Sequence, residues 1–144
     1  MPNRSIREII AHQKILSAPE SMTVREAAIR MSEARVGAVL ILDHGRLAGI
    51  FTERDILNRV IAKRLDPDAT PLSQVMTADP RTISADKPLA HALVMMDEGG
   101  YRHVPVMDNG QPVGMVSARD ALGAELLEFE SEMQRREHLT EIML

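Results

Sequence analysis

The sequence contains no cysteine and no tryptophan, and only 2% of its 144 residues are aromatic. Without cysteine the chain can form no disulfide, no thiolate nucleophile and no cysteine-ligated metal site. The formal net charge of -4 argues against the basic face that neutralises phosphates in nucleic-acid binding. No apolar run approaches the ~18 residues of a membrane span, and the charged start, MPNRSIREII, lacks the apolar segment of a signal peptide. We therefore expect a cytoplasmic protein with no nucleic-acid or membrane partner.

The most informative feature that the sequence does have is an internal repeat. The segment Val36–Leu57, VGAVLILDHGRLAGIFTERDIL, returns 65 residues later as Tyr101–Leu122, YRHVPVMDNGQPVGMVSARDAL. Without a gap, 7 of the 22 positions are identical, and most others exchange similar residues. Internal repetition of this kind determines the architecture. It predicts two copies of one small unit, related by an approximate twofold, with a cleft between them.

The first copy is predicted to fold in the order strand, helix, strand, strand, helix. Thr23 and Glu26 have the spacing of a capping box and begin a helix, which Gly37 is expected to end. The run AVLIL that follows suits a strand buried on both faces, and the DHGR sequence at 43–46 suits a hairpin turn. A last helix, starting at Glu53, is expected to place four apolar residues on one face: Ile56, Leu57, Val60 and Ile61.

The second copy repeats this order. Asp86 is the expected N-cap of its helix, Pro88 its first-turn proline, and Gly99-Gly100 its end. The strands HVPVM and PVGMV follow, joined by a DNG turn at 108–110. The chain is thus predicted to be an α+β protein of tandem β-α-β-β-α repeats related by a pseudo-twofold. Its expected parts are an N-terminal helix (1–14), the first repeat (15–65), a linker (66–78), the second repeat (79–123) and a C-terminal helical extension (124–144).

Two helices are expected outside the repeat. Ser5 and Glu8 have capping-box spacing and predict a short leading helix. The long helix at the other end carries one apolar stripe of Leu122, Leu126, Phe129, Met133 and Met143. So small a domain has too little surface to bury this stripe, which favours a homodimer contact through the helical faces and the C-terminal helix. The alternative is a solvated helical tail.

The candidate functional motif is TERD at 52–55 and its echo SARD at 117–120. Each follows a strand and opens a helix, where a hydroxyl lies beside free backbone N–H groups that favour phosphate. The aspartate three residues later projects on the same side, and its carboxylate can accept hydrogen bonds from a ribose diol. The pair therefore fits a ribonucleotide. The alternative is an ordinary helix start, since the chain uses the same spacing at Ser5 and Thr23.

A second candidate feature is Arg102-His103, which lies directly before the strand VPVM. Two cationic side chains at this place suit an arriving anion, although exposed polar residues flanking a strand are the simpler interpretation. The equivalent residues of the first copy, Gly37-Ala38, are uncharged. The two halves are therefore expected to form unequal pockets.

Taken together, these motifs resemble the cystathionine-β-synthase (CBS) domain, and the tandem resembles a CBS pair, or Bateman module, of the small stand-alone bacterial type. The resemblance rests on the duplicated pattern of strand, D-x-G turn and Gly-rich strand leading into [ST]-x-x-D, and covers about residues 15–123. It implies that the two sheets pack across a pseudo-twofold and that two pairs associate. It also implies that adenine nucleotides or adenosine derivatives bind in the clefts.

The resemblance also implies roles for individual residues. Asp55 and Asp120 would bind ribose hydroxyls, and Thr52 and Ser117 would lie near phosphate. The site expected first combines Thr52 and Asp55 with phosphate contacts from three basic residues, Arg102, His103 and Arg119. The complete set of candidate ligand-binding residues is Gly37, Ala38, Val39, Thr52, Arg54, Asp55, Arg102, His103, Val104, Ser117, Arg119 and Asp120.

These observations predict a regulatory sensor that takes AMP, ADP or ATP as an effector and holds no tightly bound cofactor. The alternative is a module for dimerisation or protein interaction that binds no nucleotide. An enzyme is disfavoured because no nucleophile or acid–base pair is recognisable. A metal site is unsupported because the five histidines show no ligand spacing.

Overall fold

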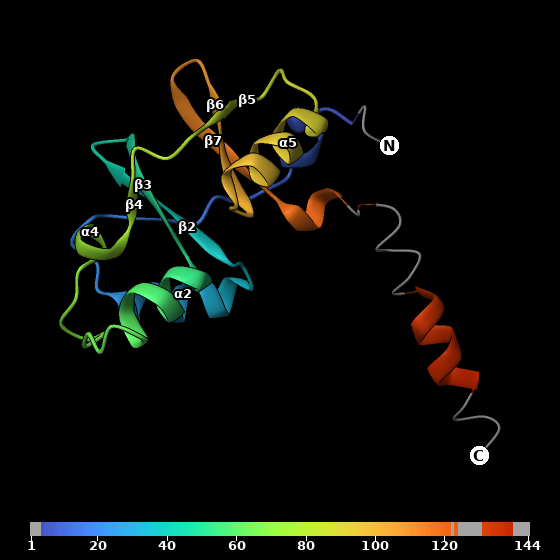
Figure 1. Ribbon diagram of the computed structural model, residues 1–144. Coiled ribbons are helices and arrows are strands. Elements are labelled where there is room, and N and C mark those ends of the chain that lie inside the picture. The colour runs from blue at the N-terminus through green and yellow to red at the C-terminus, as the bar shows by residue number, and fades with distance from the viewer. Residues whose placement is uncertain (1–3, 122, 124–130, 140–144) are drawn as a thin grey trace.

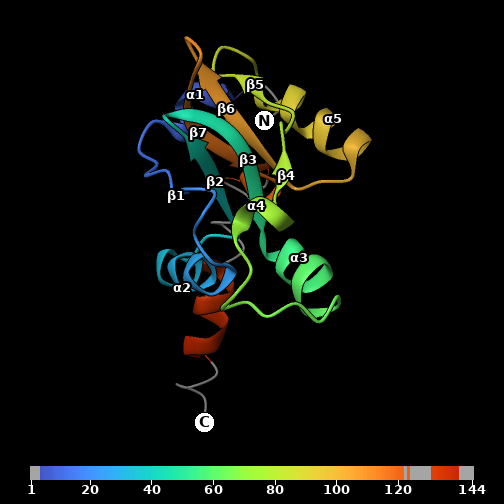
Figure 2. The same ribbon diagram turned by 90° about the vertical axis from the view of Figure 1, so that its left-hand side faces the viewer.

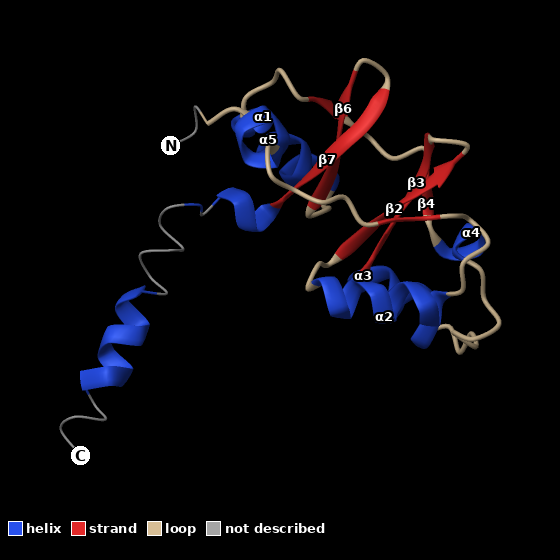
Figure 3. Cartoon of the chain, turned by 180° about the vertical axis from the view of Figure 1, so that it is seen from behind, coloured by secondary structure: helices blue, strands red, loops and turns tan. Residues whose placement is uncertain are grey.

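The computed structural model describes residues 4–121, 123 and 131–139. Two small sheets face each other in the middle of the molecule, and helices cover their outer sides (Figures 1 and 3). The central strands β3 (Arg46–Thr52) and β7 (Gln111–Ser117) contact each other between the two halves (Figure 2). The predicted α+β class and the pair of repeats are confirmed.

Both repeats follow the predicted order of elements. The first consists of β1 (Ser17–Ala18), α2 (Val24–Ala34), β2 (Ala38–Asp43), β3 and α3 (Glu53–Asp55), which continues as the π-helix η1 (Ile56–Ile61). The second consists of β5 (Ile83–Ser84), α5 (Leu89–Gly99), β6 (His103–Asp108), β7 and the 3-10 helix η2 (Ala118–Ala121). Three further elements stand before the repeats: α1 (Ile6–Ile10), α4 (Leu72–Val75) and β4 (Thr77–Ala78).

The sheets combine one parallel pairing with an antiparallel hairpin. The first has the strand order β1-β2-β3-β4 and the second β5-β6-β7. In each, the first strand runs parallel to the second, with a helix between them in the chain. Both hairpin turns have two consecutive residues with positive φ, His44-Gly45 and Asn109-Gly110. This is the type I′ geometry that two-residue hairpins favour, and it confirms both predicted turns.

The ends of the two long helices differ in part from the prediction. Helix α2 begins after the Thr23 N-cap as expected, but it ends at Ala34, because Arg35 takes the left-handed conformation with φ 56°. Gly37 therefore does not end it. Helix α5 has Pro88 as its N-cap instead of Asp86, whose carboxylate pairs with Arg7 at 2.7 Å. The expected end at Gly100 is confirmed, with φ 72°.

Helix η1 departs from the predicted apolar face. Its backbone closes i→i+5 bonds, such as the 2.9 Å bond from the Ala62 N–H to the Leu57 carbonyl. A π-helix has more residues per turn than an α-helix, and here Ile56 and Val60 pack on the first core. Val60 is fully buried, whereas Leu57 is 61% exposed. Ile61 is also exposed, and the expected stripe is divided between the core and the surface.

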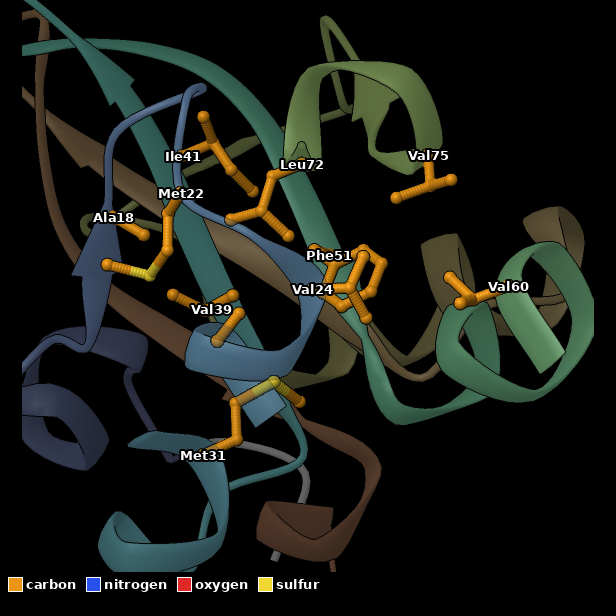
Figure 4. Close-up of a cluster of buried hydrophobic side chains, with 11 residues drawn as sticks. Ala18, Met22, Val24, Met31, Val39, Ile41, Phe51, Val60, Leu72 and Val75 are labelled. Atoms are coloured by element: carbon orange, nitrogen blue, oxygen red, sulfur yellow. The ribbon is translucent and has the colours of Figure 1, made fainter. Parts of the chain in front are cut away.

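Each repeat has its own apolar core between its sheet and its helices. Figure 4 shows the first, in which Val39, Ile41 and Phe51 of the strands meet Val24 and Met31 of α2. The second is built in the same way around Val104, Val106 and Val116. A third cluster joins the two sheets and contains Leu40, Ile50 and Met115. Full burial of a side chain of this size contributes about 1.5–3 kcal/mol before entropy is subtracted.

The helix that precedes each repeat packs onto the other repeat. Helix α1 comes before the first repeat, yet Ile6 and Ile10 are buried in the second core. Helix α4 comes before the second repeat, yet Leu72 and Val75 are buried in the first core. The 65-residue offset relates Ile10 to Val75, so the two helices occupy equivalent places. The segment expected as a linker, 66–78, thus contains α4 and β4.

Two equivalent glycines permit this exchange. A Cβ on Gly49 of β3 would lie 2.9 Å from the Thr77 carbonyl oxygen, and one on Gly114 of β7 would lie 2.8 Å from Ile10 Cβ. Only glycine leaves room for so close an approach. In the first sheet, β4 then pairs with β3. In the second, the Gln13 side chain takes that place and makes two bonds with the Met115 backbone, of 2.8 and 3.0 Å.

The described part of the C-terminal extension, residues 131–139, is a helix whose residues are all exposed. It lies away from both repeats (Figure 1). Met133, one residue of the predicted stripe, is 41% exposed. The other four, Leu122, Leu126, Phe129 and Met143, lie outside the described residues. The predicted C-terminal helix is confirmed over 131–139.

We expect Gln13→Ala to destabilise the protein by about 1–3 kcal/mol, because it leaves a strand N–H and carbonyl of Met115 without partners. Urea unfolding followed by circular dichroism measures the change. Gln111→Ala is the matched control, since Gln111 is an exposed glutamine of β7 itself. Equal losses in the two variants would contradict this role for the Gln13 amide.

Candidate functional site

Two clefts lie between the repeats, and each is built from three walls. The first, of about 470 Å³, is formed by the end of β3 with α3, the segment 79–81 after β4, and the segment 100–103 before β6. The second, of about 600 Å³, is formed by the end of β7 with η2, the segment 13–16 before β1, and the segment 35–38 before β2. The offset of 65 residues relates each wall of one cleft to a wall of the other.

Thr52 and Asp55 form one wall of the first cleft and are bound to each other. The carboxylate oxygen Oδ2 of Asp55 accepts from the Thr52 backbone N–H at 2.9 Å and from its hydroxyl at 3.1 Å. The Thr52 hydroxyl accepts from the Asp55 N–H at 3.3 Å, which completes a capping box. The second oxygen, Oδ1, lies 3.5 Å from Arg59 Nε.

Ser117 and Asp120 repeat this geometry in the second cleft. Asp120 Oδ2 accepts from the Ser117 N–H at 2.7 Å and from its hydroxyl at 3.4 Å. The TERD and SARD motifs therefore each cap the start of a helix, which is the alternative that the sequence analysis left open. In each case only one carboxylate oxygen is used by the cap, and the other can accept from a hydroxyl group of a ligand.

Glu53, Arg102 and His103 line both clefts. Glu53 and His103 meet at Gly37, where a Cβ would lie 3.1 Å from Glu53 Oε1 and 3.4 Å from His103 Nε2. Burial lowers the pKa of His103, and the neighbouring Arg102 lowers it further, while Glu53 and Asp120 act in the opposite direction. The imidazole is therefore held in its neutral form near pH 7.

Most of the basic side chains that line the clefts have no hydrogen-bond or ion-pair partner within the described part of the protein. Over the described residues, the side chains of Arg54 and Arg81 in the first cleft make no hydrogen bond or ion pair. The same holds for Lys14, Arg35 and Arg119 in the second cleft, and for Arg102 between them. Cations without partners that line a concave site favour an anionic ligand.

The structure brings together most of the residues predicted for the site. Gly37 and Ala38 line the second cleft, and Arg54 lines the first. The first expected combination is divided between the clefts, because Arg119 lines the second cleft, beside Ser117 and Asp120. It lies 65 residues after Arg54, and the duplication places it at the equivalent wall.

Val39 and Val104 line neither cleft, which corrects their prediction as ligand residues. Both are fully buried, Val39 in the first core and Val104 in the second. Successive side chains of a strand point to opposite faces. Since Ala38 faces the space between the sheets, the next residue must face the helices.

Several lining residues escaped the sequence-based prediction. The charged ones are Lys14 and Arg35 in the second cleft, Arg59, Asp79 and Arg81 in the first, and Glu53 in both. The 65-residue offset could have identified some of them, because it makes Lys14 equivalent to Asp79 and Arg35 equivalent to Gly100, and equivalent residues line equivalent walls. No motif marks Lys14, Asp79 or Arg81, which reach the clefts through the exchange of α1 and α4.

The CBS domain family model matches residues 6–62 and 72–126. The chain belongs to the CBS domain family. Both matches include the helix before the repeat, α1 in the first and α4 in the second. The unit recognised by the family model is therefore continuous in sequence, although its first helix packs onto the other copy.

Relatives and solved structures agree with this assignment. The CBS domain-containing protein CBSCBSPB5 of Arabidopsis thaliana is 37% identical over 85% of this chain. The chain spans only 22% of that relative's length. The CBS domain protein PAE2072 of Pyrobaculum aerophilum, solved in complex with AMP, has a TM-score of 0.75 and 31% identity, with 88% of this chain and 96% of that chain covered. The CBS domain pair of MJ0100, in complex with 5-methylthioadenosine and S-adenosyl-L-methionine, has a TM-score of 0.75 and 25% identity over 90% and 99% of the two chains.

The described residues contain no helix of the length and apolar character that a membrane crossing needs. Nor do they contain a group of three or more His, Asp or Glu side chains able to hold a metal ion.

We expect His103 to make the stability of the protein depend on pH. Its pKa is lowered in the folded state, so stability is complete above the ordinary value of about 6.5 and is lost as the pH falls through the folded pKa. The melting temperature of the wild type should therefore fall more between pH 7.5 and 5.5 than that of His103→Asn. His91→Asn is the control, since His91 is an exposed histidine of α5. A parallel fall in wild type and His103→Asn would contradict the buried, neutral imidazole.

Proposed function

We propose that this CBS pair is a regulatory module that binds an adenosine-containing ligand, such as AMP, ADP or ATP, in the clefts between its repeats. The observation that supports the proposal most strongly is that both clefts have a carboxylate on one wall and cations on the walls that face it. One wall offers a carboxylate oxygen that the cap does not use, at Asp55 or Asp120, and the facing walls offer cations without partners. A ribose diol suits the first, and phosphate suits the second.

The volumes of the clefts support a ligand of this size. At about 470 and 600 Å³ they lie within the ~300–1,000 Å³ of small-molecule sites. Ile50 in the first cleft and Met115 in the second add an apolar surface that suits a purine ring. The AMP complex of PAE2072 and the adenosine-derivative complex of MJ0100 support the same class of ligand.

A regulatory role fits better than a catalytic one. The polar groups of the two clefts include no nucleophile held beside an activating base: the hydroxyls of Thr52 and Ser117 are bound to carboxylates that cap helices. The ligand would act by favouring one arrangement of the two repeats over another.

We expect adenine nucleotides to raise the melting temperature, because a ligand that binds only the native state stabilises it. A thermal-shift panel of adenosine, AMP, ADP, ATP and S-adenosylmethionine tests this, with calorimetry on any ligand that gives a shift. Arg102→Ala should weaken the binding of a phosphorylated ligand roughly ten- to a hundredfold, since a hydrogen bond to a charged group contributes about 1.5–3 kcal/mol. Arg46→Ala is the matched control, because Arg46 is exposed at a hairpin and lines neither cleft.

The aspartates need a variant that preserves their cap. Asp55→Ala would remove the acceptor of the Thr52 N–H as well as the ribose contact, so lost binding would have two explanations. Asp55→Asn keeps one oxygen for the cap and replaces the other. No shift with any ligand of the panel would overturn the nucleotide proposal and leave the protein-interaction module as the better account.

We also infer that the chain forms a homodimer through its helical faces and its C-terminal helix. Helices α2 and α5 expose Ile29 and Val94, which are equivalent under the 65-residue offset, and η1 exposes Leu57 and Ile61. Along 131–139 the apolar residues Met133 and Leu139 are exposed as well. A surface of this kind on several helices is typical of a protein–protein contact.

We expect Leu57→Glu to weaken the dimer, because it places a charge in an apolar contact, and removal of residues 128–144 to weaken it further. Sedimentation velocity over a range of concentrations measures both. Lys63→Glu changes the charge of an exposed residue beyond η1 and serves as the control. A wild type that sediments as a monomer at every concentration would refute the dimer.

A further inference from the structure

The two clefts share one set of charges. Within the described part of the chain, only Glu53, Arg102 and His103 line both. We call these three residues the junction. Gly37 lies between two of them, close to Glu53 Oε1 and to His103 Nε2.

Each residue of the junction has an uncharged counterpart 65 residues away. The counterpart of Glu53 is Ala118, and those of Arg102 and His103 are Gly37 and Ala38. By contrast, Thr52, Arg54 and Asp55 of the first cleft have counterparts of the same chemistry in the second, Ser117, Arg119 and Asp120. The junction has no such second copy, and Glu53 and Arg102 each serve both clefts.

The backbone holds the two sides of the junction in the same way. The Glu53 N–H donates to the Gly37 carbonyl at 2.9 Å, and the Ala118 N–H donates to the Arg102 carbonyl at 2.9 Å. These equivalent bonds place the start of each last helix against the residue that precedes the second strand. Glu53 is the donor residue of one bond and Arg102 the acceptor residue of the other, and both line both clefts.

The other charges of the clefts do not remove this competition. The first cleft has Arg54, Arg59 and Arg81 against Asp55 and Asp79, and Arg59 lies beside Asp55. The second cleft has Lys14, Arg35 and Arg119 against Asp120 alone. The second cleft therefore has the larger excess of positive charge, and an anion is drawn to it first.

We propose that the junction couples the two clefts, so that an anionic ligand in one weakens the binding of an anionic ligand in the other. The first anion engages Arg102, and the second then meets Glu53 and the first anion while Arg102 is already occupied. The coupling depends on the charge of the ligand and not on its adenosine part. It rests on the proposed function, since it requires that both clefts take nucleotides.

The affinities of the two binding steps should differ by roughly tenfold or more for ADP and by less for AMP. ADP carries more negative charge than AMP, and the repulsion between two bound ligands grows with the charge of each. This repulsion is weak only in bulk water. Adenosine should bind in two steps of similar affinity. Salt should narrow the gap for ADP, since mobile ions screen charges across solvent. Titration calorimetry of the full chain at low and high salt measures all three.

Arg102→Gln is the deciding variant. It removes the shared cation from an exposed position, so it should weaken the tight ADP step about tenfold and bring the two steps together. Glu53→Lys supplies a second cation and should strengthen the weak step more than the tight one. The controls are Arg46→Gln and Glu33→Lys, which change exposed residues outside both clefts.

The outcomes separate this inference from the proposed function. Two ADP steps that differ in the wild type and merge in Arg102→Gln support the coupling. A single ADP step that becomes two weak steps in that variant also supports it. Two equal and independent ADP steps in the wild type, or a difference of the same size in the wild type and in Arg102→Gln, would overturn the coupling and leave nucleotide binding intact. No binding of any nucleotide would overturn both.

Discussion

The clefts depend on the close packing of each leading segment against a glycine in the last strand of the opposite repeat. At Gly49 the segment after α4 approaches β3, and at Gly114 the end of α1 approaches β7. The residues that follow each contact, 79–81 and 14–16, become walls of the two clefts. Any side chain at either glycine would push its segment away and open the wall. The packing of α1 and α4 onto the opposite repeats and the shape of the clefts therefore both require that Gly49 and Gly114 have no side chain. This explains why both copies have glycine at this position.

The same residues hold the fold and offer the chemistry. Asp55 and Asp120 each use one carboxylate oxygen to cap the helix that follows, and this bond fixes where the second oxygen lies. A ligand that used the second oxygen would contact a group already ordered by folding, so little entropy would be lost on binding. His103 shows the converse relation: its burial between the repeats keeps the imidazole neutral, and an anion in either cleft would favour its protonated form.

The two repeats have kept the scaffold symmetric and have diverged in charge. The cores, hairpins and caps correspond through the 65-residue offset, because each is needed to fold one repeat. The junction residues have no such constraint, since Arg102 is exposed and Glu53 projects into the space between the copies. A change at Glu53 or Arg102 would alter the charge of both clefts while leaving the packing of the two cores intact.

The sequence alone determined the repeat, the order of elements, the hairpin turns at 43–46 and 108–110, and the pairing of hydroxyl with carboxylate at 52–55 and 117–120. These features are local, or follow from comparing one copy with the other. It did not determine where α1 and α4 pack, that Val39 and Val104 face the cores, or that Lys14 and Arg81 line the clefts. Only the tertiary structure decided these, because a crossing between repeats leaves no periodicity in the chain. The register of a strand and the exchange of a helix depend on contacts between residues far apart in sequence.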